Sequence, residues 1–146
     1  MNIDDVIRSK GDSKVVTIAP TATVADLVKT LADKRIGALV VSVDGEHIDG
    51  IVSERDVVRG LAAHGAEVVN ATVADIMTST VHTVEPNESV ESTAQSMTVH
   101  RIRHMPIVVG GRMVGLVSIG DVVKHRIDQL TDERDHLIGY VQSSGS

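Results

Sequence analysis

A seven-residue pattern that occurs twice constrains the fold of this chain more than any other feature. Residues 50–56 read Gly-Ile-Val-Ser-Glu-Arg-Asp, and residues 115–121, which lie 65 positions later, read Gly-Leu-Val-Ser-Ile-Gly-Asp. In each copy a short apolar run of strand type precedes the serine, and a Val-Val pair after the aspartate begins a helical pattern. The serine and the aspartate are therefore predicted to lie where a strand passes into a helix.

Two interpretations of this strand-to-helix corner are compatible. A serine followed three positions later by an acidic residue is typical of a capping box, which satisfies free backbone N–H groups at a helix start. The same groups suit a nucleotide, because a helix N-terminus and a hydroxyl attract a phosphate while the carboxylate accepts the hydroxyls of a ribose. The repetition of the corner favours the second role in addition to the first.

The rest of the chain repeats with nearly the same offset. Pro20 and Pro86 are 66 positions apart, as are Val24 and Val90, and the offset becomes 65 after a hairpin that is one residue longer in the first copy. Each copy reads as β-α-β-β-α. The predicted strands are residues 15–18, 38–43, 47–53, 81–84, 105–109 and 112–118. The predicted helices are residues 3–9 (ending near Gly11), a helix capped by Thr23, 54–63, 72–77, 89–99, and one that follows the second corner.

We therefore predict an α/β (α+β) fold made of two β-α-β-β-α units that pack as a pseudo-twofold pair. Each small unit would expose an apolar sheet face unless it packed on the other. The predicted domains are residues 1–66 and 67–146, the second with an extended C-terminal helix. Two equivalent clefts are expected between the units, at the two corners.

Composition excludes several classes of function. The 146 residues are 42% apolar and 23% charged, as in globular proteins, and they include no cysteine, phenylalanine or tryptophan. Base-stacking platforms and cysteine-based chemistry are thereby excluded, and the net charge of −6 argues against a nucleic-acid partner. No segment has the length and apolar character of a membrane span, and the N-terminus lacks a signal-peptide pattern, so we expect a cytoplasmic protein.

The chain resembles a stand-alone tandem pair of cystathionine-beta-synthase (CBS) domains, also called a Bateman module, over residues 1–128. The resemblance is carried by Thr-Ile-Ala-Pro at 17–20 with Thr-Val-Glu-Pro at 83–86, by Arg-Ile-Arg-His-Met-Pro-Ile-Val at 101–108, and by the two Gly-x-Val-Ser-x-x-Asp corners. It implies a regulatory module that binds an adenosine-containing ligand in the clefts and requires no cofactor.

The resemblance also implies roles for particular residues. Asp56 with Ser53, and Asp121 with Ser118, would bind ribose hydroxyls and phosphate. Cationic phosphate contacts would come from just before the second strand, where the second copy has Arg103 and His104 but the first has only the uncharged pair at 37–38. Because phosphate prefers guanidinium and imidazolium donors, we expect the second cleft to be the stronger site.

The sequence leaves three points open: the role of Arg55, the residues that contact adenine, and the identity of the ligand. Arg55, inside the first corner, either compensates for the missing cations or is simply solvated. Adenine recognition is implied for the first strand of a repeat, which is Thr17 in one copy and Thr80, Val81 and His82 in the other. AMP is the first choice of ligand, with ADP, ATP, NAD(H) or S-adenosylmethionine as alternatives.

Other functions fit the sequence less well. His100 and His104 have a metal-like spacing but straddle a helix end and a strand start, so no metal site is predicted. Ser118, His104 and Asp121 could be written as a catalytic triad, but no nucleophile elbow accompanies them, and no enzyme activity is expected. The hypothesis from a different class is a structural or interaction protein whose corners serve only as caps.

The C-terminal helix predicts self-association. Val123, Ile127, Leu130, Leu137 and Val141 follow a near-heptad spacing that Arg134 interrupts. Part of this seam reaches beyond a single repeat and would be exposed in a monomer. We therefore expect a homodimer, which the family resemblance also implies, and a protein target of unknown identity is a further implied partner. The alternative is that the last residues fold back on their own subunit or fray.

Overall fold

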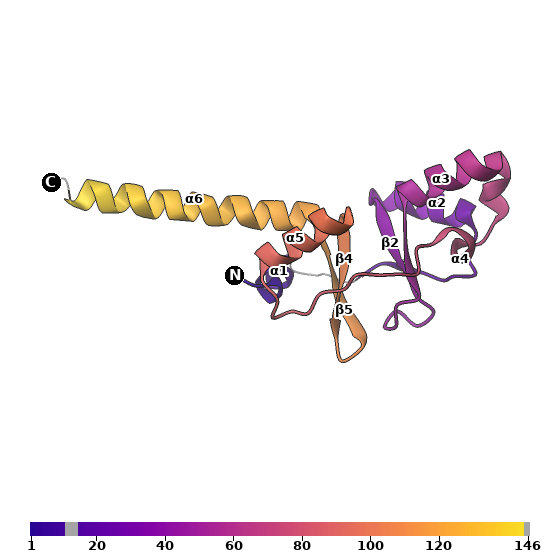
Figure 1. Cartoon of the computed structure of the whole chain (residues 1–146), viewed down its shortest axis with the longest axis horizontal. Coiled ribbons are helices and arrows are strands. Elements are labelled where there is room, and N and C mark those ends of the chain that lie inside the picture. The colour runs from indigo at the N-terminus through magenta and orange to yellow at the C-terminus, as the bar shows by residue number, and fades with distance from the viewer. Residues whose placement is uncertain (11–14, 145–146) are drawn as a thin grey trace.

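The computed structural model describes residues 1–10 and 15–144 and contains two halves beside each other, with one long helix extending away from the second half (Figure 1). The elements in chain order are α1 (Ile3–Ser9), β1 (Thr17–Ile18), α2 (Val24–Lys34), β2 (Ala38–Val41), β3 (Gly50–Ser53), α3 (Glu54–His64), the 3-10 helix η1 (Gly65–Asn70), α4 (Val73–Ile76), α5 (Val90–His100), β4 (His104–Val109), β5 (Arg112–Ser118) and α6 (Ile119–Ser144). The predicted α/β class is confirmed.

The first sheet has three strands in the order β1-β2-β3. β2 pairs in parallel with β1 and antiparallel with β3. All four residues of β2 are buried, as expected for a central strand, and α2 packs Leu27 and Leu31 against Leu39 and Val52 of the sheet. The spacing of Leu27 and Leu31 on α2 thus places one helical face on the sheet.

The second sheet differs from the prediction, because residues 81–84 form no strand. The described pairing is β4 with β5, and Val84 joins them only through an isolated parallel bridge to Ile107. Two hydrogen bonds make the bridge, from Val84 N to Pro106 O (3.0 Å) and from Val108 N to Val84 O (2.9 Å). Pro106 occupies the position of Val40 in the first half and has no N–H to donate, which limits the pairing to one bridge.

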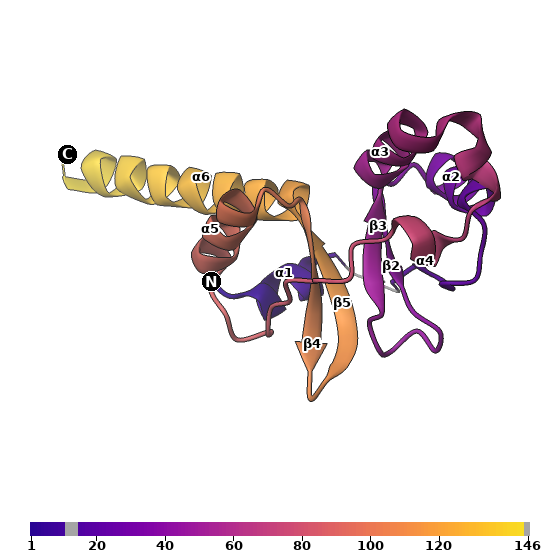
Figure 2. The same cartoon turned by 45° about the vertical axis from the view of Figure 1, so that its right-hand side comes forward.

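The short leading helix of each half packs in the other half's core. Ile3 and Val6 of α1 are buried with Val84, Val117 and other residues of the second half. Val73 of α4 is buried in the first core instead. Figure 2 shows α1 beside β4 and β5, and α4 beside β2 and β3. The domain boundary between residues 66 and 67 stays a prediction. Each hydrophobic core contains residues from both sides of this boundary.

Equivalent β-bridges fix where these leading helices start. Asn2, the N-cap of α1, forms a bridge with Ser89, the N-cap of α5. Thr72, the N-cap of α4, forms the same bridge with Thr23, the N-cap of α2. The pseudo-twofold relation therefore extends to the helix starts.

Several helices and strands begin or end at other residues than predicted. The first hairpin has a wider connection than predicted, because β2 ends at Val41 and β3 begins at Gly50. Within that connection the Asp44 carboxylate accepts hydrogen bonds from Glu46 N and His47 N, both at 2.8 Å, and so holds a local turn. α1 ends at Ser9, and the predicted end near Gly11 lies outside the described residues.

The C-terminal helix α6 is 26 residues long and continues through Gly139. It extends beyond the second half without folding back on it (Figures 1 and 2). No helix among the described residues has the length and apolar character needed to span a membrane.

Candidate functional site

The second corner combines a capping box with an ion pair. Ser118 N donates to Asp121 Oδ2 at 2.9 Å, and Asp121 N donates to Ser118 Oγ at 3.2 Å. This reciprocal pair closes the first turn of α6. Lys10 Nζ, which follows α1, donates to the same Asp121 Oδ2 at 2.8 Å and to Leu116 O at 3.0 Å. The Asp121 carboxylate is therefore ion-paired with a lysine from near the other end of the chain.

The charge state of Asp121 follows from these contacts. Burial alone would raise the pKa of Asp121, but hydrogen bonds from Lys10 and from Ser118 outweigh it and hold the pKa below its ordinary value. The group is thus an anionic acceptor at neutral pH. Such a carboxylate can accept hydrogen bonds from the two hydroxyls of a diol.

The first corner has the same capping geometry and different neighbours. Ser53 and Asp56 form a capping box at the start of α3. Asp56 Oδ2 accepts from Ser53 N at 2.9 Å and from Ser53 Oγ at 3.2 Å, while its Oδ1 accepts from the Thr78 hydroxyl at 3.4 Å. The residue that follows the leading helix and contacts the aspartate is therefore the neutral Thr78 in the first corner and the cationic Lys10 in the second.

Arg103 and Gly37 are shown to be equivalent by their backbone contacts. Ile119 N, at the start of α6, donates to Arg103 O at 2.8 Å. Glu54 N, at the start of α3, donates to Gly37 O at 3.0 Å. The residue at this position adjoins the N-terminus of the corner helix, where an anion is favoured. Only the second half has a cationic side chain there, and Arg103 is exposed.

His104 lies where the two halves meet. It pairs with Ser118 across β4 and β5. A side-chain carbon built on Gly37 would lie 3.9 Å from His104 Cε1 and 3.7 Å from Glu54 Oε1, so His104 faces the start of α3. Burial lowers the pKa of His104 below its ordinary value; Asp121 and Glu54 oppose this effect, and Arg103 and Lys10 reinforce it. His104 is therefore neutral at pH 7, a form in which one ring nitrogen can donate and the other can accept a hydrogen bond.

The residues predicted to contact adenine are less closely grouped. Thr17 is half-buried on β1 beside Val40, two positions along the sheet from the pairing of Ala38 with Ser53. Thr80 is exposed and Val81 is half-buried. Within the described part of the chain, no hydrogen bond joins residues 80–82 to either corner.

His82 stacks on another ring in the structure, and its predicted contact with adenine stays a prediction. Its ring stacks on His100 at the end of α5, with centroids 3.7 Å apart and an interplanar angle of 15°. A stacked pair presents ring faces to each other rather than converging nitrogen atoms. Among the described residues, no group of three or more His, Asp and Glu side chains could hold a metal ion.

The structure thus brings Arg103, His104, Ser118 and Asp121 to one corner and Ser53, Arg55 and Asp56 to the other. Sequence reasoning missed Lys10, Thr78 and Glu54. Lys10 and Thr78 follow leading helices that cross to the opposite half in the packing. No local sequence pattern predicts such a contact. The sequence does show that the segments before the two otherwise regular repeats differ in length.

Comparison with known proteins now identifies the fold. The family model described as CBS domain matches residues 3–63 and 73–128. The chain belongs to the CBS-domain family. It is 38% identical over 147 residues to the mitochondrial CBS domain-containing protein CBSX3 of Arabidopsis thaliana, an alignment that covers 96% of this chain and 71% of that protein.

Solved structures agree with this assignment. A putative signal-transduction protein with CBS domains from Burkholderia ambifaria superposes with a TM-score of 0.82 at 39% identity, covering 88% of this chain and 95% of that one. A CBS domain protein from Pyrobaculum aerophilum, solved in complex with AMP, superposes with a TM-score of 0.72 at 28% identity, covering 83% and 89%. The fold predicted from the repeat is confirmed.

Proposed function

We propose that this protein is a regulatory module that binds an adenine nucleotide, AMP first, with the Ser118/Asp121 corner as its stronger site. It acts by binding rather than by catalysis. Ligand would shift the equilibrium between two arrangements of the halves, a coupling that is typically ~1–3 kcal/mol. The change would be passed to a protein target or to the protein's own assembly.

The observation that carries this proposal is the grouping of complementary chemistry at the start of α6. An anionic carboxylate that suits a ribose diol lies at Asp121, in the N-terminal turn of α6, where the helix dipole favours an anion such as phosphate. The cationic Arg103 and the hydrogen-bonding His104 adjoin the same turn. The AMP complex of the Pyrobaculum aerophilum protein supports the choice of ligand.

The first corner is proposed as the weaker site. Its position equivalent to Arg103 is Gly37, and the first residue of its corner helix is Glu54, whose carboxylate repels a phosphate. Arg55 is exposed on the first turn of α3 and is the cation available nearby. The alternatives ADP, ATP, NAD(H) and S-adenosylmethionine share the adenosine group, and the phosphate contacts at Arg103 favour the nucleotides.

Calorimetric titration with AMP and adenosine tests the assignment of Arg103. Arg103→Ala should weaken AMP binding roughly 10- to 150-fold, since charge-assisted hydrogen bonds contribute ~1.5–3 kcal/mol, and should leave adenosine binding unchanged. Arg112→Ala, which removes an exposed arginine at the opposite end of the β4–β5 pairing, is the matched control. Unchanged AMP affinity in Arg103→Ala with lost affinity in Arg55→Ala would assign the stronger site to the first corner.

A structural or interaction protein is the second candidate function, favoured by the complete capping boxes at both corners. Asp121→Ala separates the two candidates. On the nucleotide proposal this variant loses AMP binding. On the structural proposal it has no binding to lose and costs only about 1 kcal/mol of stability, as the removal of a helix cap does.

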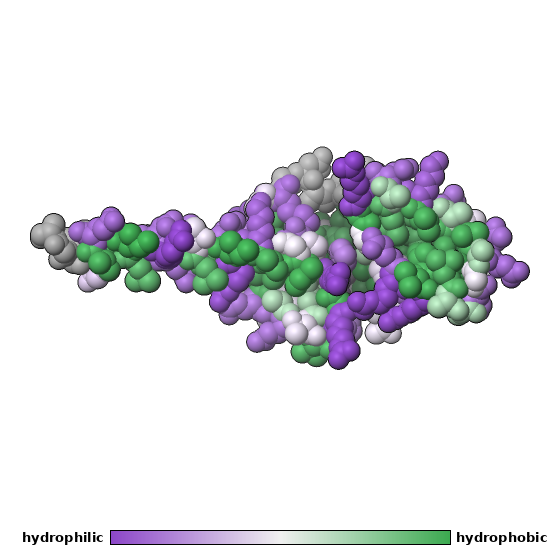
Figure 3. Space-filling view, turned by 90° about the horizontal axis from the view of Figure 1, so that it is seen from above, coloured by the Kyte–Doolittle hydropathy of each residue, from purple (hydrophilic) through white to green (hydrophobic). Residues whose placement is uncertain are grey.

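We also propose that the protein is a homodimer that α6 helps to hold. Large exposed apolar side chains continue along this helix, and Figure 3 shows apolar surface both along α6 and over the first half. The residues on α6 include Val123, Ile127, Leu130, Leu137 and Ile138. Such a surface is typical of a contact between chains.

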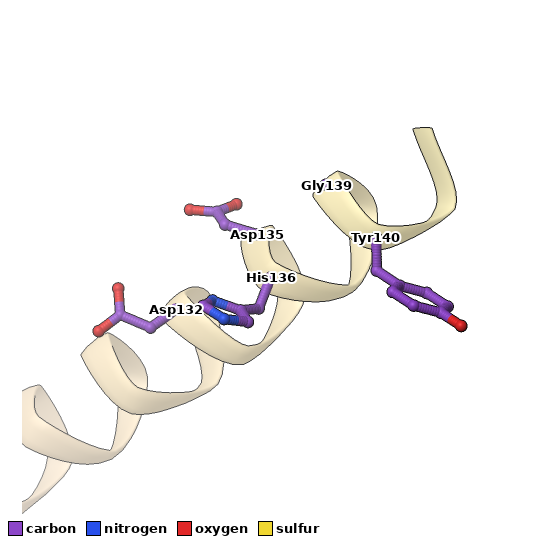
Figure 4. A pocket seen from close by; sticks show the side chains of 5 residues that line it. All are labelled: Asp132, Asp135, His136, Gly139 and Tyr140. Carbon is purple, nitrogen blue, oxygen red and sulfur yellow. The ribbon is translucent and has the colours of Figure 1, made fainter. Parts of the chain in front are cut away.

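The end of α6 extends beyond the second half (Figure 1). A hollow there is lined by Asp132, Asp135, His136, Gly139 and Tyr140, all on one helix, as Figure 4 shows. A second copy of α6 would supply an opposite wall. Light scattering should give a dimer for the full chain and weaker association for a chain that ends after Asp128. A monomeric full chain would contradict the dimer, and an equally tight truncated dimer would contradict the role of α6.

A further inference from the structure

Polar contacts join Ser9 and Lys10, at the C-terminal end of α1, and Met1, before its start, to the first two turns of α6 and to the end of β5. We call this set of contacts the α1 clasp. Lys10 Nζ contacts Asp121 Oδ2 and Leu116 O. Ser9 Oγ lies 3.1 Å from His125 Nε2, and Met1 Sδ lies 2.7 Å from His125 Nδ1. Asp121 and His125 are four positions apart and so share one face of α6. The clasp therefore joins the candidate ribose-binding carboxylate to the start of the chain.

The clasp differs in strength from the rest of α1. Ile3 and Val6 have exposed fractions of 0% and 1% and anchor the start of the helix in the second core. Ser9 and Lys10 are exposed, and the Lys10 and Asp121 side chains retain exposed fractions of 34% and 21%. Partly exposed ion pairs contribute little to stability, so this end can separate from α6 without unfolding the helix start.

The carboxylate of Asp121 has limited capacity for a ligand. Its Oδ2 atom already accepts from Ser118 N and from Lys10 Nζ. A ribose diol that donates one hydroxyl to each carboxylate oxygen needs Oδ2 as well, and so competes with the lysine. The first corner contains no such competition from a lysine, because Asp56 accepts there from the Thr78 hydroxyl at its other oxygen.

We propose that the ribose of a ligand displaces Lys10 from Asp121 and thereby opens the α1 clasp, so that occupancy of the second corner is transmitted to the N-terminal segment. This inference rests on the proposed nucleotide-binding function. Coupling between two sites is reciprocal: if the ligand loosens the clasp, a loosened clasp strengthens ligand binding. Variants that open the clasp without touching the ligand must therefore bind it more tightly.

Adenosine is the appropriate probe, because it carries the ribose diol without a phosphate that Lys10 could contact after displacement. In calorimetric titration Lys10→Met should bind adenosine roughly two- to fivefold more tightly, the range that follows from the weak contribution of a partly exposed ion pair. His125→Ala should shift affinity in the same direction by less. Lys29→Met, which removes an exposed lysine from α2, is the matched control and should bind as the unaltered protein does.

Hydrogen exchange provides the second measurement. Saturating adenosine should accelerate exchange of the amides of residues 7–10 in the unaltered protein, and exchange there should be fast with or without adenosine in Lys10→Met. Weaker adenosine binding by Lys10→Met would overturn the proposal and make Lys10 a ligand contact. Exchange at residues 7–10 that does not respond to bound adenosine would overturn it as well.

The outcomes also separate this proposal from the function on which it rests. If the unaltered protein binds neither adenosine nor AMP, the nucleotide-binding function is wrong, and the displacement of Lys10 by a ribose is wrong with it. If it binds them while the clasp variants behave as the control does, only the clasp proposal is wrong.

Discussion

The two corners of this protein share a backbone and differ in their surroundings. Both place serine at a helix N-cap and aspartate three positions later, and both close a capping box. Beyond the capping box, Asp121 contacts Lys10 and is close enough to His104 to affect its pKa, whereas Asp56 contacts Thr78. The repeat thus specifies the shape of each corner, while residues from distant segments set the charge and the hydrogen-bonding groups around it.

The leading helices account for much of this difference. α1 has seven residues and continues to Ser9, which brings Lys10 to the second corner. α4 has four residues, after which Thr78 forms a bridge with Ile51 of β3. The longer helix α1 thus places a positive charge, on Lys10, at the second corner. The extended segment after the shorter helix α4 places a hydroxyl group, on Thr78, at the first corner.

The largest expected effect tests whether each leading helix stabilises the opposite half. Ile3→Ala should lower the free energy of unfolding by about 2–5 kcal/mol, because Ile3 is fully buried in the second core. Urea unfolding gives the magnitude, and hydrogen exchange locates the effect in β4 and β5. Val73→Ala is the counterpart and should accelerate exchange in β2 and β3. Loosening of the first sheet by Ile3→Ala would contradict the crossed packing.

A smaller effect is expected from the glycines that open the two corner motifs. A Cβ on Gly50 would lie 2.7 Å from Met77 Sδ and 2.8 Å from the Thr78 carbonyl oxygen, which the bridge to Ile51 holds in place. A Cβ on Gly115 would lie 3.2 Å from Ile107 Cδ1, the end of a flexible side chain. Gly50→Ala should therefore cost about 1–3 kcal/mol of stability.

Gly115→Ala should cost less than about 1 kcal/mol, since alanine also reduces the conformational freedom of the unfolded chain. Thermal unfolding of both variants provides the measurement. Equal costs would mean that the segment after α4 does not restrict the first corner as the structure shows.

The sequence predicted the features that depend on local chemistry. The alternation of apolar residues located most helices and strands within a few positions, and the offset of Pro20 and Pro86 revealed the repeat. The serine and aspartate of each corner were found because a helix start needs hydrogen-bond acceptors of that kind. Apart from the repeat offset, these signals come from residues that are close neighbours in the chain.

Contacts between distant segments were not predictable in the same way. The apolar pattern of α1 requires that Ile3 and Val6 be buried, but it does not indicate which core receives them. The contact of Lys10 with Asp121 depends on that choice. The missing strand at residues 81–84 follows from Pro106, whose effect on a neighbouring strand could have been weighed from the sequence.

The smallest expected effect concerns the equivalent positions Ala38 and His104, of which only His104 has a titratable side chain. Burial holds the pKa of His104 below its ordinary value in the folded protein. An unfolded histidine takes up its proton near pH 6.5, so below that pH the unfolded chain binds more protons than the folded one. The stability contributed by neutral His104 is therefore complete above about pH 6.5 and is lost as the pH falls through and below that value.

Urea unfolding at pH 7.5 and pH 5.5 measures this effect. The unaltered protein should lose a small part of its stability on acidification, and His104→Gln should lose less, because glutamine keeps the hydrogen-bonding capacity without titrating. His64→Gln, which replaces an exposed histidine in the last turn of α3, should leave the loss as it is. Equal losses in both variants would mean that the meeting point of the two halves does not desolvate His104. The second corner would then differ from the first in its charges alone.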